Sequence, residues 1–146
     1  MMEFSTKADT LRGLAGKLTT AQVLPQVCLT AGEVRSCPAR AITLLRDAGL
    51  LDRRLIVRSS ARNEDTAERS NAGKYLSIPG VEGEADILRA VARVAESMGP
   101  DPENQILIQP FLTDVELCGV AFTMDPNTGG NYYVLNYDCT TGSTSS

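Results

Sequence analysis

Histidine and tryptophan are both absent from the 146-residue sequence. The lack of histidine excludes a histidine general base, a histidine metal ligand and a phosphohistidine intermediate within this chain. The four cysteines, Cys28, Cys37, Cys118 and Cys139, never form a C-x-x-C pair, so reduced and mostly buried thiols are expected rather than a zinc or redox site. No apolar run approaches the roughly 18 residues needed to cross a bilayer, and the N-terminus lacks the pattern of a secretory signal. We therefore expect a cytoplasmic protein without a membrane partner.

Basic residues are missing from the C-terminal third of the chain. All 14 Lys and Arg lie at or before Arg93, whereas seven of the 18 acidic residues follow it. This split is consistent with a basic lobe that binds a polyanionic ligand and an acidic lobe that lies beside the metal ion bound to that ligand. Charged residues on solvent-exposed helix faces are the alternative explanation for each charge taken individually. The acidic total and the lack of a dense basic run argue against nucleic acid as a partner. With 42% hydrophobic residues the chain can bury a real core.

The spacing of apolar residues predicts three helices. Ser5 or Thr6 can cap the first, whose apolar residues recur three and four positions apart. A second helix is predicted over Ser36–Ala48, with Ser36 as its cap and Gly49 closing it. The third covers Glu84–Met98, where apolar residues form one stripe and acids occupy the first turn. The apolar residues of the first helix are Ala8, Leu11, Leu14, Ala15 and Leu18.

Several segments have the residues of strands. Gln22–Thr30 is interrupted by Pro25 and is predicted to be an edge strand or an extended segment. Lys74–Ile78 is a short strand that Pro79-Gly80 turns, and residues 55–57 form a buried strand. From residue 105 onward the apolar period is two, which predicts strands over 106–112, 118–124 and 132–137. The turn over residues 125–130 makes the last two an antiparallel hairpin.

The buried strand at residues 55–57 ends in a guanidinium and two hydroxyls. Arg58, Ser59 and Ser60 are groups suited to holding an anion, and phosphate is the obvious candidate. An ordinary turn would explain the serines equally, and a surface ion pair with Glu64 or Asp65 would explain the arginine.

The chain carries neither a Walker phosphate loop nor a dinucleotide fingerprint. The order of its segments resembles the ATP-grasp nucleotide-binding domain of the pyruvate phosphate dikinase and phosphoenolpyruvate synthase family. Four segments carry this resemblance: Thr6–Leu11, similar to G-K-x-x-N-L; Leu24–Thr30, similar to V-P-x-G-F-V-I-T; Val57–Asp65 with Ala72 and Gly73, close to V-R-S-S-A-x-x-E-D and the end of S-F-A-G; and Ile108–Leu112 followed by Gly119–Gly129, resembling V-Q-x-M-V and S-G-V-x-F-T-x-D-P-x-T-G.

The resemblance implies a set of ATP-binding residues. Lys7 would reach the nucleotide phosphates, Arg58 would hold phosphate, and the loop ending at Gly73 would close over the nucleotide. The backbone of a hinge strand would read the adenine edge between two lobes. A solvated role for Lys7 and plain hairpin chemistry for the 125–130 turn are the alternatives. The full predicted set is Lys7, Arg58, Ser59, Ser60, Gly73, Gln109, Pro110, Phe111 and Leu112.

The chain also departs from the family pattern. The loop after Gly73 is shortened, Asn71 stands where an aromatic is usual, and Cys118 replaces a serine. The family's acidic metal ligands lie beyond the region that resembles Tyr137–Ser146, so the Mg²⁺ ligands are expected outside residue 146. The phosphohistidine and substrate domains of the family are absent from this chain.

These observations predict an α+β, ATP-grasp-like, two-lobed nucleotide-binding module with mixed or antiparallel sheets and flanking helices, incomplete at its C-terminus. Residues 1–99 would form a basic lobe with the phosphate contacts, and residues 100–146 the start of a β-rich lobe with the adenine hinge. The predicted function is to bind ATP within a phosphotransferase that phosphorylates a histidine on a separate domain, and this fragment alone would not be active. The alternative is a non-catalytic nucleotide-binding, regulatory or interaction module.

Overall fold

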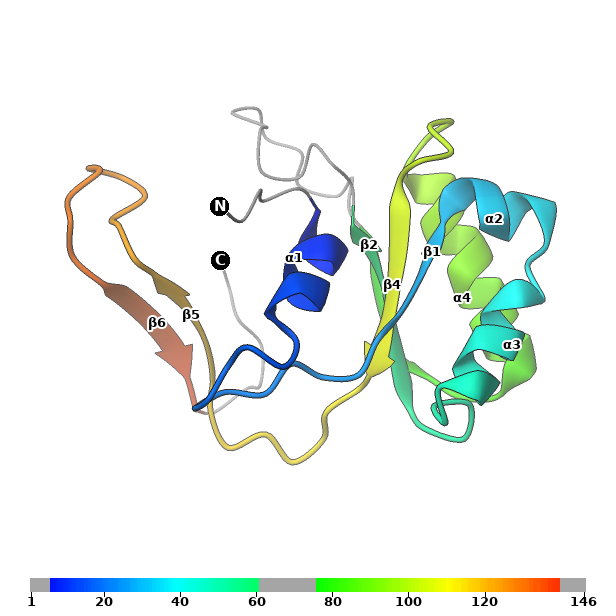
Figure 1. Cartoon of the computed structure of the whole chain (residues 1–146), viewed down its shortest axis with the longest axis horizontal. Helices are drawn as coiled ribbons and strands as arrows, with labels where there is room; N and C mark the ends of the chain where they lie inside the picture. Colours follow the sequence, from blue (N-terminus) through cyan, green and yellow to red (C-terminus); the bar gives the residue numbers. More distant parts are fainter. Residues whose placement is uncertain (1–5, 61–75, 140–146) are drawn as a thin grey trace. The chain divides into compact units, whose positions relative to one another are not determined.

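The computed structural model of the chain describes residues 6–60 and 76–139 (Figure 1). Its contacts divide the chain into two compact units, Met1–Phe111 and Leu112–Ser146. The described elements of the first unit are α1 (Lys7–Leu14), β1 (Val27–Thr30), α2 (Ala31–Ser36), α3 (Arg40–Asp47), β2 (Leu55–Ser60), β3 (Ser77–Val81), α4 (Glu84–Ser97) and β4 (Gln105–Pro110). The second unit contains β5 (Cys118–Phe122) and β6 (Val134–Asp138). The α+β class with antiparallel sheets and helices is therefore confirmed.

The first unit is built on a four-stranded sheet of order β1-β4-β2-β3. Every neighbouring pair is antiparallel. Strand β4 lies inside the sheet, and its residues 106–109 are all buried, which explains why this strand reads as a nearly continuous apolar run. Strand β1 forms an edge, as the interruption by Pro25 predicted, and its regular pairing begins only at Val27.

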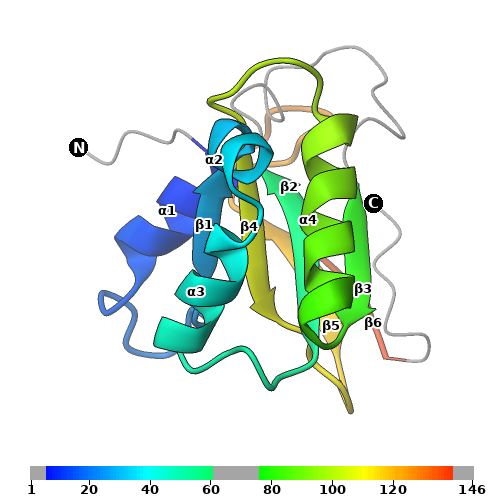
Figure 2. The same ribbon diagram turned by 90° about the vertical axis from the view of Figure 1, so that its right-hand side faces the viewer.

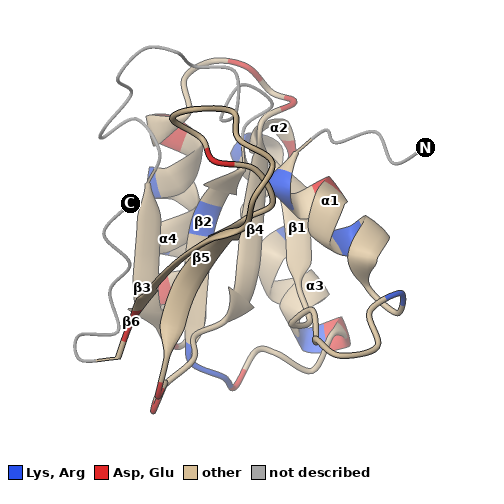
Figure 3. Cartoon of the chain, turned by 90° about the vertical axis from the view of Figure 1, so that its left-hand side faces the viewer, with Lys and Arg blue, Asp and Glu red and all other residues tan. Residues whose placement is uncertain are grey.

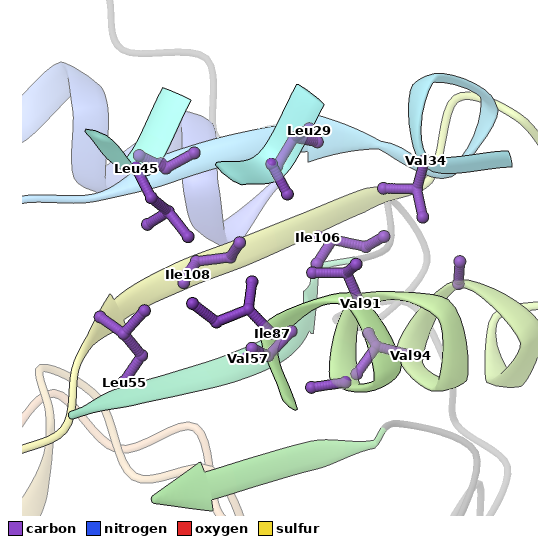
Figure 4. Close-up of a cluster of buried hydrophobic side chains, with 14 of the residues drawn as sticks. Leu29, Val34, Leu45, Leu55, Val57, Ile87, Val91, Val94, Ile106 and Ile108 are labelled. Carbon is purple, nitrogen blue, oxygen red and sulfur yellow. The ribbon is translucent and has the colours of Figure 1, made fainter. Parts of the chain in front are cut away.

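Three helices cover one face of this sheet and enclose the core (Figure 2). Helix α4 contacts β2, β3 and β4, while α2 and α3 contact β1 and α4. The predicted stripe on α4 is confirmed, because Ile87, Val91 and Val94 are fully enclosed. They meet alternate residues of the strands, among them Leu55 and Ile108 (Figure 4). We call this side of the sheet the three-helix face.

The second predicted helix, Ser36–Ala48, corresponds to α3, but its predicted cap is wrong, and the sequence did not predict α2, the helix before it. Helix α2 begins after Thr30, whose hydroxyl accepts the Glu33 N–H at 3.1 Å while the Glu33 carboxylate accepts the Thr30 N–H at 2.8 Å. This capping box satisfies two backbone donors that a helix start leaves unpaired. Ser36 ends α2 rather than capping a helix, and α3 begins at Arg40 without a side-chain cap.

Two other predicted boundaries also differ from the structure. Helix α1 ends at Leu14, so Leu18, which was assigned to its apolar face, is 41% exposed. Strand β3 runs through Pro79 and Gly80 instead of turning there. Between the Leu55↔Val81 and Val57↔Ile78 pairs, β3 has one more residue than β2. Gly80, with φ of 70°, absorbs this extra residue as a β-bulge.

The second unit is an antiparallel hairpin, as predicted. Strands β5 and β6 pair from Cys118↔Asp138 to Phe122↔Val134. The connecting turn is closed by the Asp125 N–H, which donates to the Gly130 carbonyl at 3.0 Å, and by the Gly129 N–H, which donates to the Asp125 carbonyl at 2.9 Å. Gly129 has a φ of 70°, which other residues rarely adopt.

The four cysteines are free thiols, but they are not mostly buried as expected. Cys37 and Cys139 are exposed, while Cys28 and Cys118 are half-buried. Burial raises the pKa of the Cys28 thiol, which keeps this sulfur protonated at neutral pH. No helix in the described part of the chain is long and apolar enough to cross a membrane.

The compact units do not coincide with the two lobes drawn from the sequence at residues 1–99 and 100–146. Strand β4 pairs with β1 and β2 and belongs to the first unit, which ends at Phe111. The assignment of residues 1–99 to a basic, phosphate-contacting lobe and of residues 100–146 to a β-rich lobe with the adenine hinge stays a prediction.

Candidate functional site

The face of the sheet opposite the three helices carries polar side chains together with apolar ones. Because side chains alternate along a strand, the residues that follow or precede core positions project to this second face. Helix α1 lies on the same side (Figure 1), and we therefore call this side of the sheet the α1 face. Its central residues are Ile56, Arg58 and Ser60 from β2, and Gln105, Leu107 and Gln109 from β4.

Arg58 lies in the middle of the α1 face, directly opposite Leu107 on one side and Ser77 on the other. Its side chain is half-buried. The Nε atom is enclosed and has no hydrogen-bond partner among the described residues. Buried donors are nearly always paired in folded proteins, so an enclosed guanidinium N–H without a partner indicates a group that a ligand can satisfy. Figure 3 shows this side of the sheet with basic positions on β2 and α1.

The side chains of Arg58, Ser59 and Ser60 do not all lie on the same face of the sheet. Strand β2 extends to Ser60, so strand alternation directs Ser59 to the three-helix face, away from Arg58. Ser59 is 2% exposed, and its backbone N–H donates to the Leu76 carbonyl at 3.0 Å. Ser60 shares the face of Arg58, but it is fully buried and its hydroxyl oxygen accepts the Ala8 N–H at 3.0 Å. Ser60 therefore contacts α1 directly.

Lys7 is the first residue of α1 and is exposed. Thr6 caps the helix, because its hydroxyl accepts the Asp9 N–H at 3.1 Å. The contact between Ala8 and Ser60 places the backbone next to Lys7 against the end of β2. Lys7 and Arg58 thus come from neighbouring parts of the α1 face, although they are 51 positions apart in the sequence.

The predicted hinge residues occupy the end of β4 and the residues after it. Gln109 is 7% exposed and lies opposite Ile56, which makes it a diagonal neighbour of Arg58 on the same face. The Phe111 N–H donates to the Arg54 carbonyl at 2.8 Å, and the Arg54 guanidinium lies 5.4 Å from the centre of the Phe111 ring. Leu112 is the first residue of the second unit, and Gly73 lies outside the described residues.

The position of Pro110 follows from the hydrogen-bonding pattern of β4. Since Phe111 directs its backbone groups toward β2, Pro110 directs its own to the opposite side, where β1 would lie. Strand β1 pairs only as far as Val27, opposite Ile108. A proline without an N–H is therefore tolerated here, and its carbonyl faces a part of the sheet edge that β1 does not reach.

The carboxyl pKa of Asp125 in the hairpin turn is strongly lowered. Hydrogen bonds from the Thr128 hydroxyl at 2.6 Å, the Tyr132 hydroxyl and the Asn127 N–H at 2.9 Å lower its pKa to about 2. All three donors lie in the loop between β5 and β6, so the carboxylate acts locally, as expected for hairpin chemistry. Across residues 6–60 and 76–139, no three His, Cys, Asp or Glu side chains form a group that could hold a metal ion.

Comparisons with known proteins place this arrangement in a family context. The sequence profile described as "Pyruvate phosphate dikinase, AMP/ATP-binding domain" matches residues 30–102, which is half of the chain. The matched range includes Arg58 and Gly73 but neither Lys7 nor the hinge residues. The "Prodigiosin synthesizing transferase PigC" of Serratia marcescens is 29% identical over 97 residues, covering 58% of this chain and 11% of PigC. The chain thus spans about a tenth of this curated relative. No solved structure matches the chain.

Proposed function

Because the chain belongs to the family of AMP/ATP-binding domains of pyruvate phosphate dikinase, we propose that it is the ATP-binding portion of a phosphotransferase. In this proposal ATP phosphorylates a histidine on a separate domain, as in phosphoenolpyruvate synthase. The chain has no histidine of its own, so the acceptor must belong to another domain or polypeptide. A cytoplasmic location and the finer ATP-grasp arrangement of the two lobes belong to the same proposal.

Arg58 is the observation that supports this function best. It projects from the middle of a sheet, within the range that the family profile matches, and its enclosed Nε lacks a partner among the described residues. A guanidinium forms its strongest hydrogen bonds with phosphate and carboxylate oxygens. A nucleotide phosphate at this position would satisfy the unpaired donor and would neutralise the buried part of the charge.

The other predicted residues have distinct parts in the proposal. Lys7 would add a second positive charge to the polyphosphate, while the end of β4 and the two residues after it, 109–112, would present backbone groups to adenine. Mg²⁺ would supply charge neutralisation between phosphate groups, with its ligands outside the described residues. The protein itself would contribute positioning and electrostatic stabilisation, which are the main components of phosphoryl-transfer catalysis.

The first test is calorimetry of the chain with Mg-ATP. It compares Arg58→Ala with a control in which another arginine is replaced by alanine. Arg58→Ala should weaken ATP binding by about 1.5 to 3 kcal/mol, because it removes a charge-assisted hydrogen bond to phosphate. Arg93→Ala removes the same charge from an exposed position on α4 and should leave the affinity unchanged. Equal affinities for the native chain and Arg58→Ala would refute the role of Arg58.

A second experiment separates phosphotransfer from simple binding. The chain is incubated with labelled ATP and a histidine-containing domain of a phosphoenolpyruvate synthase, and the product is tested for acid-labile, base-stable label. Because this chain has no histidine, such label on the added domain reports transfer between polypeptides. ATP binding without any transfer would favour the alternative of a non-catalytic nucleotide-binding module.

A further inference from the structure

Side chains from two strands hold the first turn of α1. The Ala8 N–H donates to Ser60 Oγ at 3.0 Å, at the end of β2. The Thr6 hydroxyl lies 2.6 Å from Gln105 Oε1, at the start of β4. The Gln105 side-chain amide in turn lies 3.3 Å from the Asp9 carboxylate. Ser60 and Gln105 are directly opposite each other in the sheet, so they form a single polar end to the α1 face.

Two backbone N–H groups at the start of α1 have acceptors in different places, one in the helix cap and one in the sheet. The first N–H groups of an α-helix have no partner within the helix. In α1 the Thr6 cap accepts the Asp9 N–H, whereas Ser60 accepts the Ala8 N–H. Thr6 is 3% exposed and Ser60 is fully buried, so water does not compete for these contacts. The start of α1 is therefore fixed to the sheet by directional hydrogen bonds.

Lys7 lies between the two anchored residues. Its backbone is held on both sides, by the cap at Thr6 and by the contact from Ala8 to Ser60. Ser60 is two residues from Arg58 on the same face of β2, which is a distance of roughly 7 Å along the strand. This spacing brings the starting points of the Lys7 and Arg58 side chains within reach of a common polyphosphate.

We propose that Ser60 and Gln105 are positioning residues, which hold α1 so that Lys7 and Arg58 contact the phosphates of the same nucleotide. This inference rests on the proposed function. It replaces the direct phosphate contact predicted for Ser60 from the sequence, because the Ser60 side chain is fully buried against the backbone of α1. The proposed ligand is a nucleoside triphosphate, whose phosphate chain is long enough to contact two separate cations.

A double-mutant cycle on Ser60 and Lys7 tests the inference with Mg-ATP as the probe. Ser60→Ala should weaken binding about fivefold, as expected for the loss of one buried hydrogen bond. In the Lys7→Ala background the same change should have no further effect, because Ser60 acts through Lys7. Ser60→Thr, which keeps the hydroxyl, should restore most of the affinity. An undiminished effect of Ser60→Ala in the Lys7→Ala background would overturn the proposal, since it would mean direct contact or general damage.

Hydrogen exchange supplies a readout that needs no ligand. Ser60→Ala should speed exchange of the α1 amides, Ala8 above all, while the amides of β4 keep their protection. Gln105→Ala should also speed exchange of the α1 amides. Gln105 is less buried than Ser60, so this substitution serves as the second variant if Ser60→Ala fails to fold. Ser36→Ala is the control, because the Ser36 hydroxyl donates to the Gly32 carbonyl at 2.9 Å, within α2. Unchanged exchange of α1 in both variants would overturn the positioning role.

Calorimetry distinguishes a wrong function for the chain from a wrong positioning role for Ser60. If the native chain shows no heat with Mg-ATP, the proposed function of the chain is wrong, and the positioning role falls with it. If the native chain binds ATP and Ser60→Ala binds it equally well, only the positioning role is wrong.

Discussion

The first unit encloses a continuous apolar core, whereas most of the large apolar side chains described in the second unit are exposed to solvent. In the first unit, residues from α2, α3, α4 and the sheet are buried together. In the second, Tyr133 is 78% exposed, Leu135 67% and Tyr137 73%. The buried residue of the hairpin is polar: Asp125 is 9% exposed and is surrounded by turn donors.

The two units therefore derive their structure from different interactions. Burial of apolar surface stabilises the first unit and couples residues far apart in sequence. The hairpin depends on a local strand ladder and on the hydrogen bonds of its turn, and an isolated two-stranded hairpin is only marginally stable in water. Substitutions should therefore have large, cooperative effects in the first unit and small, local effects in the second.

The largest effect is expected from Ile108→Ala in the core of the first unit. Ile108 is fully buried on the three-helix face, so its truncation should lower the free energy of unfolding by about 2 to 5 kcal/mol. Urea unfolding followed by far-UV circular dichroism measures this change, because all described helices belong to the first unit. A loss below about 1 kcal/mol would contradict a tightly packed core at this position.

An intermediate effect is expected from Thr30→Ala, which removes the capping box of α2. The free energy of unfolding should fall by about 1 kcal/mol, because the backbone donor of Glu33 loses its partner. The same urea experiment measures the change. Thr30→Ser should retain most of the stability, and Thr43→Ala, at an exposed position within α3, should be neutral. Equal effects of Thr30→Ala and Thr43→Ala would show that the cap is unimportant.

The smallest and most local effect is expected from protonating Asp125. Hydrogen bonds to the carboxylate lower its pKa to about 2, from an unfolded value of about 3.9. Its stabilisation of the turn is therefore fully present above pH about 3.9 and disappears as the pH falls through about 2. The amide signals of Asn127 and Gly129 in NMR spectra should report this transition, and Asp125→Asn should abolish it. A transition that persists in Asp125→Asn would have to come from another group.

The sequence predicted the elements whose pattern is local and regular. The apolar stripe of α4, the edge position of β1 and the antiparallel pairing of β5 with β6 were all confirmed. Each depends on periodicity or turn chemistry within a short segment. The family resemblance was confirmed by the match over residues 30–102, while the roles of the individual site residues stay predictions.

The features that sequence reasoning missed depend on contacts between distant segments. Strand β2 was expected to end at Val57, but pairing with β4 continues to Ser60 opposite Gln105. This extension sends Ser59 and Ser60 to opposite faces, which the sequence of three adjacent polar residues does not indicate. The capping box at Thr30 was a local signal, the S/T-x-x-E pattern, that could have identified α2.

The bulge in β3 has a consequence for how the protein behaves at high concentration. Strand β3 forms an outer edge of the described sheet, and a regular edge offers a row of N–H and carbonyl groups to strands of other molecules. Pro79 removes one of the donors, Gly80 breaks the spacing of the rest, and the Arg54 guanidinium lies over Gly80, with Nη2 3.1 Å from where a Cβ would be. An irregular, charged edge is a poor template for fibril growth, so this bulge protects the sheet from polymerising with its own copies.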